Sequence, residues 1–121
     1  MSEEVTESIL GSIKRLIGIH ENDKEFDAEI MVHINSSLSD LVQMGVGPNT
    51  GFIITDNTST WFDFIGDDLY KQSQVKLYVF AKVKLGFDSS NLQSATIESY
   101  RNIANECAYR LYVENDNKST E

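Results

Sequence analysis

The sequence predicts an all-α fold: a small helical bundle of four longer helices with a protruding loop or short β-hairpin around residues 45–58. Two observations predict it. Apolar residues recur three or four positions apart through four separate segments, whereas the one clear β-prone stretch, 52–55, is only about four residues long. With 121 residues the chain fits one domain. We expect a helical domain over 1–113 and a polar C-terminal tail over 114–121.

The expected helices follow from their apolar stripes and from their start and stop signals. They cover about residues 4–17, 23–44, 69–87 and 92–113, and Thr60 is expected to cap a short helical turn over 61–65. Asp23 is the expected N-cap of the second helix, and Gly45 ends that helix in a left-handed conformation. The helix over 69–87 has apolar residues outside its main stripe, so we expect it to be central in the domain or at an interface.

Composition and charge narrow the class of function. The net charge of −9 disfavours a fold that neutralises many phosphates, so tight wrapping of nucleic acid is not expected. No apolar run is long enough for a membrane span, and residues 1–10 lack the pattern of a signal peptide. We therefore expect a protein made in the cytoplasm, with no membrane partner.

The stretch 44–66 holds four of the seven glycines, the only proline and the only tryptophan. Its glycines resemble a nucleotide-binding loop, which would make the chain an enzyme or a nucleotide-binding protein. That motif needs a strand before the glycines and a helix directly after them, and here the order is reversed. The glycines are better interpreted as one helix stop and two turns.

Few side chains are candidates for catalysis or metal binding. His20 and His33 have no cysteine or histidine at a metal-ligand spacing, and we interpret His33 as a satisfied, partly buried residue. The single cysteine, Cys107, lies on the apolar seam of its helix and is expected to be an inert buried thiol, although a Cys107–His33 pair stays open. Four aspartates lack the spacing of a calcium loop and are interpreted as caps and solvent-facing residues: Asp56, Asp63, Asp67 and Asp68. We expect no catalytic residue, no metal and no cofactor.

The aromatic pair Trp61-Phe62 lies beside the glycine-rich stretch. Adjacent helical positions point about 100° apart, so the two rings do not easily share one apolar face. This leaves room for one of them to be an exposed anchor of an interface.

Three stretches together resemble a known family: FDAEIMVHINSSLSDLVQMGVGP, GFIITDNTSTWFDFIGDD and VKLYVFAKVKLGFD, followed by a final amphipathic helix. The chain is similar, over about residues 9–113, to the small head–tail connector, or adaptor, proteins of long-tailed bacteriophages. The resemblance implies a structural protein of the virion neck, made in the host cytoplasm. It implies a homo-oligomeric ring, usually twelvefold, that sits beneath the portal protein and is followed by a head-closure (stopper) or tail protein. Genome DNA would pass through its channel without tight binding.

Two sets of interface residues follow from joining this resemblance to the sequence pattern. The expected contact with an adjacent subunit or the next ring uses Phe52, Ile53, Ile54, Trp61 and Phe62. The expected contact with the portal uses the end of the last helix and the start of the tail, at Tyr112, Val113, Glu114, Asn115 and Asp116. The alternative is a prophage- or bacterium-encoded helical interaction domain that forms a small oligomer.

Overall fold

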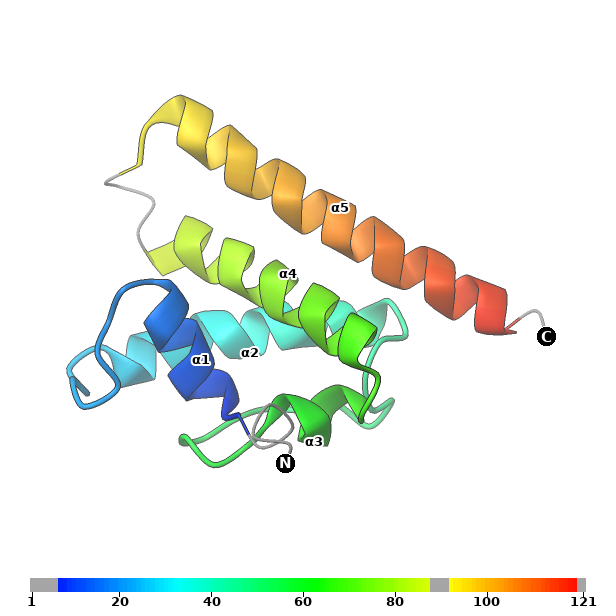
Figure 1. Ribbon diagram of the computed structural model, residues 1–121, viewed down its shortest axis with the longest axis horizontal. Helices are drawn as coiled ribbons and strands as arrows, with labels where there is room; N and C mark the ends of the chain where they lie inside the picture. Colours follow the sequence, from blue (N-terminus) through cyan, green and yellow to red (C-terminus); the bar gives the residue numbers. More distant parts are fainter. Residues whose placement is uncertain (1–6, 88–91, 120–121) are drawn as a thin grey trace.

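The computed structural model describes residues 7–87 and 92–119, with residues 114–119 described by their backbone alone. The described residues form five helices: α1 (Ile9–Leu16), α2 (Asp27–Gln43), α3 (Trp61–Ile65), α4 (Leu69–Phe87) and α5 (Ser94–Ser119) (Figure 1). The predicted all-α class is confirmed. Within these residues the only β-type pairing is an isolated bridge between Ser8 and Thr60, so the stretch 45–58 is a loop and not a hairpin.

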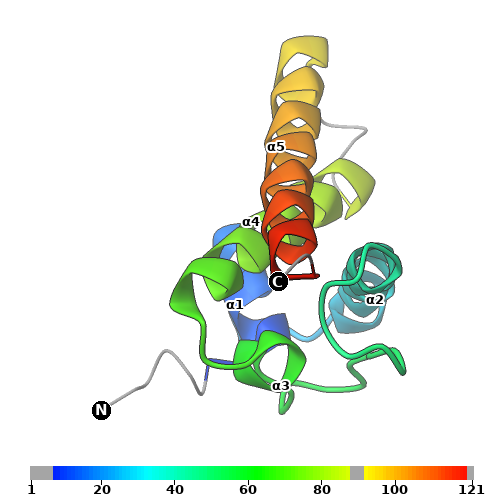
Figure 2. The same cartoon turned by 90° about the vertical axis from the view of Figure 1, so that its right-hand side faces the viewer.

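Helix α4 is the centre of the bundle and contacts each of the other four helices. Figure 2 shows α5 packed along one side of α4, with α1, α2 and α3 on the other side. The predicted stripe of α4 is fully buried at Val75, Val79 and Val83. On α5, the predicted seam is buried at Cys107 and Leu111. The central position expected for the helix over 69–87 is therefore confirmed.

Helix α1 begins later than the apolar stripe predicts. The Ser8 side chain caps it by accepting a hydrogen bond from the Gly11 N–H at 2.8 Å, so Glu7 and Ser8 precede the helix. The Glu7 carboxylate instead pairs with Arg15 and, at 2.8 Å, with the ammonium of Lys76 on α4. The expected residues 4–6 of this helix lie outside the described part of the chain.

Helix α2 begins at Asp27 and not at the predicted N-cap, Asp23, because a buried lysine holds the preceding segment in a turn. The Lys14 ammonium donates to the backbone carbonyls of Glu21 at 3.1 Å and Asp23 at 2.7 Å. It also lies 2.7 Å from the buried Oδ1 of Asp27, and this ion pair balances both charges. With both carbonyls directed at the Lys14 ammonium, residues 21–26 form turns and the helix starts after them.

Two further expectations about the ends of elements are corrected. Helix α5 does not end at Val113: its backbone continues to Ser119, through most of the segment expected to be a separate tail. The loop over 45–58 does not protrude along its whole length, since Val46 and Ile54 are buried in the core. The Asn35 side chain of α2 accepts a hydrogen bond from the Ile54 N–H at 2.8 Å and donates to the Ile54 carbonyl at 3.0 Å. That paired contact fixes the middle of the loop to the bundle.

Candidate functional site

The five residues expected to form the contact with an adjacent subunit or the next ring lie in different environments. Ile53 is 67% exposed and Phe62 is 47% exposed, whereas Ile54 and Trp61 are buried. Phe52 is half-buried, and its ring lies edge-on to Phe64 with centroids 5.2 Å apart. The side chains of Ile54 and Trp61 therefore belong to the core and are not available as a surface. Ile53 and Phe62 remain candidates, with Phe52 at their base.

Trp61 is buried because its indole nitrogen finds a partner inside the protein. Its Nε1–H donates to the Ser12 hydroxyl at 2.8 Å, and that hydroxyl donates to the Ile9 carbonyl at 3.1 Å. This short chain of hydrogen bonds joins α3 to α1. A tryptophan held in this way stabilises the fold and leaves the role of exposed anchor to Phe62.

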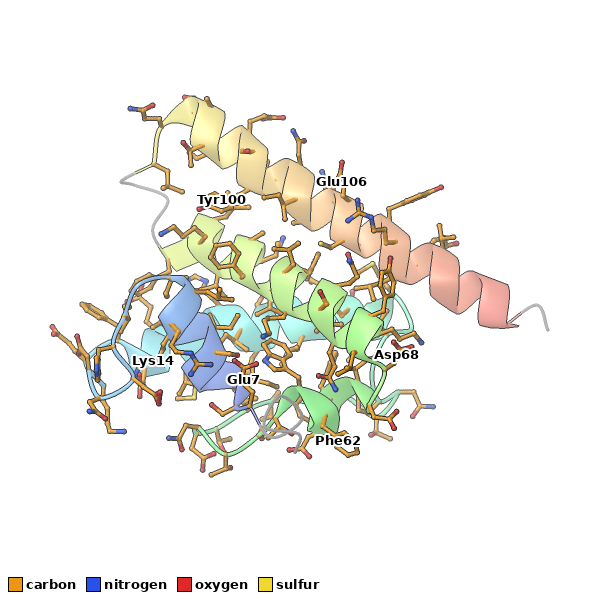
Figure 3. The ribbon with its side chains drawn as sticks, viewed as in Figure 1. Glu7, Lys14, Phe62, Asp68, Tyr100 and Glu106 are labelled. Carbon is orange, nitrogen blue, oxygen red and sulfur yellow. The ribbon has the colours of Figure 1, made fainter. Side chains whose placement is uncertain are left out.

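A capping box sets the orientation of α3. The Thr60 hydroxyl accepts from the Asp63 N–H at 3.1 Å, and the Asp63 carboxylate accepts from the Thr60 N–H at 3.0 Å. With its start fixed, this one-turn helix directs Trp61 and Phe64 into the core. Figure 3 shows Phe62 at the outer edge of the same helix.

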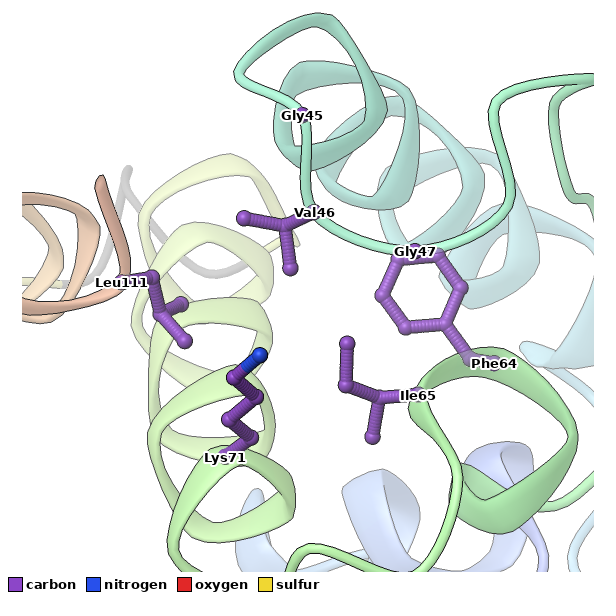
Figure 4. Close-up of a pocket in the computed structure, with 7 residues that line it drawn as sticks. All are labelled: Gly45, Val46, Gly47, Phe64, Ile65, Lys71 and Leu111. Atoms are coloured by element: carbon purple, nitrogen blue, oxygen red, sulfur yellow. The ribbon is translucent and has the colours of Figure 1, made fainter. Parts of the chain in front are cut away.

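The glycines of the loop serve backbone geometry and packing. Gly45, Gly47 and Gly51 all have positive φ, near +90°. A Cβ atom at Gly47 would lie 2.6 Å from the Phe64 ring, so that ring occupies the space beside the backbone. Figure 4 shows this contact at the edge of a hollow of about 260 Å³, to which Lys71 and Leu111 also contribute. The helix stop at Gly45 is confirmed, and the interpretation as turns fits better than a phosphate-binding loop.

The other titratable candidates have structural partners. A Cβ atom at Gly86 of α4 would lie 2.5 Å from Nδ1 of His33, so the His33 ring packs against α4. Burial raises the pKa of the Cys107 thiol, which keeps it protonated and poorly nucleophilic. Hydrogen bonds from the Thr58 side chain and backbone lower the pKa of Asp56. Over residues 7–87 and 92–119 no three histidine, cysteine or acidic side chains gather as metal ligands would.

Helix α5 presents an exposed aromatic face near its end. Tyr112 is 53% exposed and Tyr109, one turn earlier, is 69% exposed, while Val113 is partly buried. The backbone of Glu114, Asn115 and Asp116 is helical. The structure thus places the expected portal residues on one continuous helix.

Sequence reasoning missed a second exposed apolar region, which we call the leucine groove. It lies between α1 and α4, and its apolar side chains are Leu16, Leu69, Leu77 and Phe80. Leu16 lies on the apolar stripe of the first helix, where burial is expected, yet it is 48% exposed. The available signal was Leu77, which lies outside the main stripe of α4. That signal indicates an interface but does not locate it.

The fold and these surfaces define a class of protein: a small α-helical protein whose distinctive features are exposed apolar surfaces of the kind that mark interaction sites. A family model described as "Phage connector protein" matches residues 9–118, almost the whole chain. The chain therefore belongs to the phage connector protein family. It is a structural connector protein of a bacteriophage, a component of the virion that assembles with other phage structural proteins.

No curated protein and no solved structure gave a match. In the described part of the chain, every helix is too short or too polar to cross a lipid bilayer. The family match confirms the resemblance seen in the sequence.

Proposed function

We propose that this connector forms a ring beneath the portal protein, twelvefold as the family resemblance implies, and links the DNA-filled capsid to the next connector or tail protein. The observation that carries this proposal is the combination of separate exposed apolar surfaces on one small domain. Ile53 and Phe62 lie on the loop and α3, the leucine groove lies on α1 and α4, and Tyr109 and Tyr112 lie on α5. A subunit of a stacked ring needs several such contacts, to its two neighbours and to the rings above and below.

The end of α5 is the proposed contact with the portal. This helix has 26 residues, about 39 Å, whereas its partner α4 has 19 residues, about 28 Å. Leu111 is the last buried residue described on α5, and the helix runs on for residues 112–119, about 12 Å, past the start of α4, which runs in the opposite direction (Figure 1). A helix end with one free face can enter a groove of another protein. Tyr112 and Val113 would supply the apolar anchors, and positions 114–116 would supply the polar rim.

The loop and α3 form the second proposed contact, to an adjacent subunit or the next ring. Ile53 is an exposed apolar residue on a segment that Asn35 fixes to α2. Because the backbone beside it is already ordered, docking costs little conformational entropy. Phe62, exposed on the short helix that follows the loop, would add aromatic area to the same surface.

The experiment is imaging of the purified protein mixed with the portal protein from the same phage. Rings stacked on the portal in negative-stain class averages are the expected result, and their rotational symmetry gives the number of subunits. A small oligomer that never binds the portal would contradict the proposal and support the alternative helical interaction domain. Calorimetry with ATP, GTP and NAD serves as the test of nucleotide binding, and no heat of binding is expected.

A further inference from the structure

A hollow of about 480 Å³ lies where α2, α4 and α5 meet, and we call it the three-helix hollow. It shares no lining residue with the leucine groove. On each wall the lining residues are three or four positions apart, so one face of each helix borders the hollow. They are His33, Ser36 and Ser37 of α2, Lys82, Leu85 and Gly86 of α4, and Ile97 and Arg101 of α5.

The lining of the three-helix hollow is basic, although the chain as a whole is acidic. Among the described residues that line it, Lys82 and Arg101 carry a positive charge and none carries a negative one. The Arg101 guanidinium forms no ion pair within the part of the chain that the structure describes. Acidic side chains outnumber basic ones by 19 to 10, and still none of the described ones pairs with this arginine. Its charge is therefore available to a ligand.

The Lys82 ammonium has a partner but is held weakly. It lies 4.0 Å from Oδ2 of Asp40, and the Tyr78 hydroxyl lies 3.4 Å from the same oxygen. Asp40 is not among the residues that line the hollow. A long ion pair between two partly exposed side chains contributes little to stability, so the ammonium can turn toward an anion in the hollow at small cost.

Two neutral groups add hydrogen-bond donors. The His33 ring lies against α4 at Gly86, where a Cβ atom would be 2.5 Å from Nδ1, so the glycine makes room for the ring. Within the described residues the ring nitrogens have no hydrogen-bond partner, and a neutral imidazole always carries one N–H. The Ser36 hydroxyl is exposed beside it. The Ser37 hydroxyl, by contrast, already donates to the His33 carbonyl at 2.9 Å.

The helix dipoles do not decide the sign of the potential in the hollow. Ile97 is the fourth residue of α5, close to the positive end of that helix. Gly86 is the last residue but one of α4, close to the negative end of that helix. The two partial charges oppose one another, so the charged side chains determine that the hollow attracts an anion.

We propose that the three-helix hollow binds a tetrahedral oxyanion, of which inorganic phosphate is the simplest example. The groups that would hold it are the Arg101 guanidinium, the Lys82 ammonium, the His33 imidazole and the Ser36 hydroxyl. Donors from three helices match an ion whose four oxygens point in different directions better than they match a planar carboxylate. The bound ion would join α5 directly to α2, two helices that otherwise both pack on α4.

The ligand is the free ion and not the phosphate backbone of DNA. A duplex carries its phosphates in long rows, so it would bring most of its charge against the acidic remainder of a chain with a net charge of −9. A single phosphate needs only the hollow. Since one water takes about 30 Å³, the hollow has room for the ion and several waters.

The two histidines of the chain provide a test with an internal control. His33 lines the hollow, whereas His20 precedes α2 and its Nδ1 accepts a hydrogen bond from the Asn22 N–H at 3.0 Å. The full chain is titrated with sodium phosphate at constant pH and ionic strength, and the imidazole protons are followed by NMR, with His20→Gln to assign the signals. The His33 signals should shift and reach a plateau, and the His20 signals should not.

Two arginine variants test the residues of the site. Arg101→Gln removes the unpaired guanidinium and should weaken phosphate binding at least tenfold, because it removes charge-assisted hydrogen bonds. Arg110→Gln is the matched control and should bind phosphate as the wild type does. Arg110 is also an exposed arginine of α5, but it lies outside the hollow, 3.5 Å from Glu106. Both variants should keep the wild-type circular dichroism spectrum.

Three outcomes would overturn the proposal. If the His33 signals shift no more than those of His20, the hollow does not bind phosphate. If Arg101→Gln binds phosphate as tightly as Arg110→Gln does, the ion is not held by the three-helix hollow. If sodium acetate shifts the His33 signals at lower concentration than phosphate does, the hollow takes a carboxylate and the tetrahedral oxyanion is wrong.

Discussion

Ile53 and Ile54 are neighbours in the chain with opposite environments, and the Asn35 side chain accounts for the difference. By binding both backbone groups of Ile54, it orients that side chain into the core and leaves Ile53 outside. The alternation of an extended segment predicts one residue in and one out. It does not predict which, because the choice depends on a residue of α2.

The matched variants Ile53→Asp and Ile54→Asp test this assignment. Ile53→Asp should keep the fold and its unfolding midpoint, and should abolish ring formation on the portal. Ile54→Asp places a carboxylate in the core, which costs several kcal/mol out of a total stability of about 5–15 kcal/mol, so it should unfold or nearly unfold the protein. Circular dichroism with urea and negative-stain imaging measure the two effects. Normal rings from Ile53→Asp would remove this segment from the interface.

Gly47 and Gly51 give a second matched pair, Gly47→Ala and Gly51→Ala. Both residues have positive φ, so alanine at either position strains the backbone by about 1 kcal/mol. At Gly51 a Cβ atom meets open space, whereas at Gly47 it lies 2.6 Å from the Phe64 ring. We expect Gly47→Ala to lower the free energy of unfolding by at least about 1 kcal/mol more than Gly51→Ala does. Equal losses in urea denaturation would show that Phe64 moves aside freely.

Tyr78 makes stability depend on pH in the alkaline range. Burial raises its pKa to about 12, and the nearby Asp40 carboxylate adds to the shift. The folded state therefore holds the phenolic proton more tightly than the unfolded state, whose pKa is about 10. The resulting stabilisation is complete below pH 10 and is lost as the pH rises from 10 to 12. Urea unfolding at pH 9 and pH 11 should show a larger decrease for the wild type than for Tyr78→Phe, and equal decreases would contradict the assignment.

At the scale of elements, α5 depends on local hydrogen bonds once it extends beyond the bundle. A helix that has begun adds residues at little cost, which is why α5 continues to Ser119 through a sequence without apolar residues. The prediction of a tail from residue 114 rested on burial alone. It was wrong about the backbone because burial is not required to extend an existing helix.

Deletion of residues 114–121 tests the role of this helix end. The variant should lose the helical signal of the six residues 114–119 and keep its unfolding midpoint, because the buried seam through Leu111 is intact. Its affinity for the portal should fall about fivefold, about 1 kcal/mol, because the proposed polar rim is removed while the proposed anchors Tyr112 and Val113 stay. Sedimentation of the variant with the portal measures the affinity. Docking at full affinity would move the portal contact to another surface.

The helices also show how far the sequence predicts the fold. The helix over 69–87 was predicted with its observed bounds, because its apolar stripe is long and Asp68 caps its start by accepting from the Lys71 N–H at 3.1 Å. The start of α2 was not predicted, since it depends on an ammonium that comes from another helix, Lys14 of α1. Periodic apolar patterns predict that a helix is present, whereas contacts between distant residues determine where that helix begins or ends.

The candidate site was likewise predicted where it depends on the local sequence, and missed where it depends on contacts between distant residues. The sequence located the loop, the aromatic pair and the end of α5, and it predicted that one of Trp61 and Phe62 is exposed. It did not predict that Ser12 would bind Trp61, so Trp61 was assigned to a surface. The leucine groove was missed because its walls come from α1 and α4, and the direction of Leu16 depends on how those helices cross.

At the scale of the whole molecule, the uneven distribution of charge is the main feature. The chain carries a net charge of −9, yet the only charged side chains of helix α4 are four lysines. Two of those lysines are paired within the chain, Lys76 with Glu7 and Lys82 with Asp40, so a ring of such subunits would be acidic as a whole. A channel with an acidic wall repels DNA and lets it move without being held.

The isolated protein should therefore fail to bind double-stranded DNA even at low salt, where attraction between a basic surface and phosphate is strongest. Fluorescence anisotropy of a labelled duplex at about 20 mM salt, with a basic DNA-binding protein as the positive control, is the measurement. We expect no change in anisotropy at protein concentrations of about 10 µM, which lies within the range of typical non-specific dissociation constants, about 10⁻⁴–10⁻⁶ M, at higher salt. A signal that disappears as salt is added would show that the lysines of α4 reach phosphate. Such binding would contradict a channel through which DNA passes without being held.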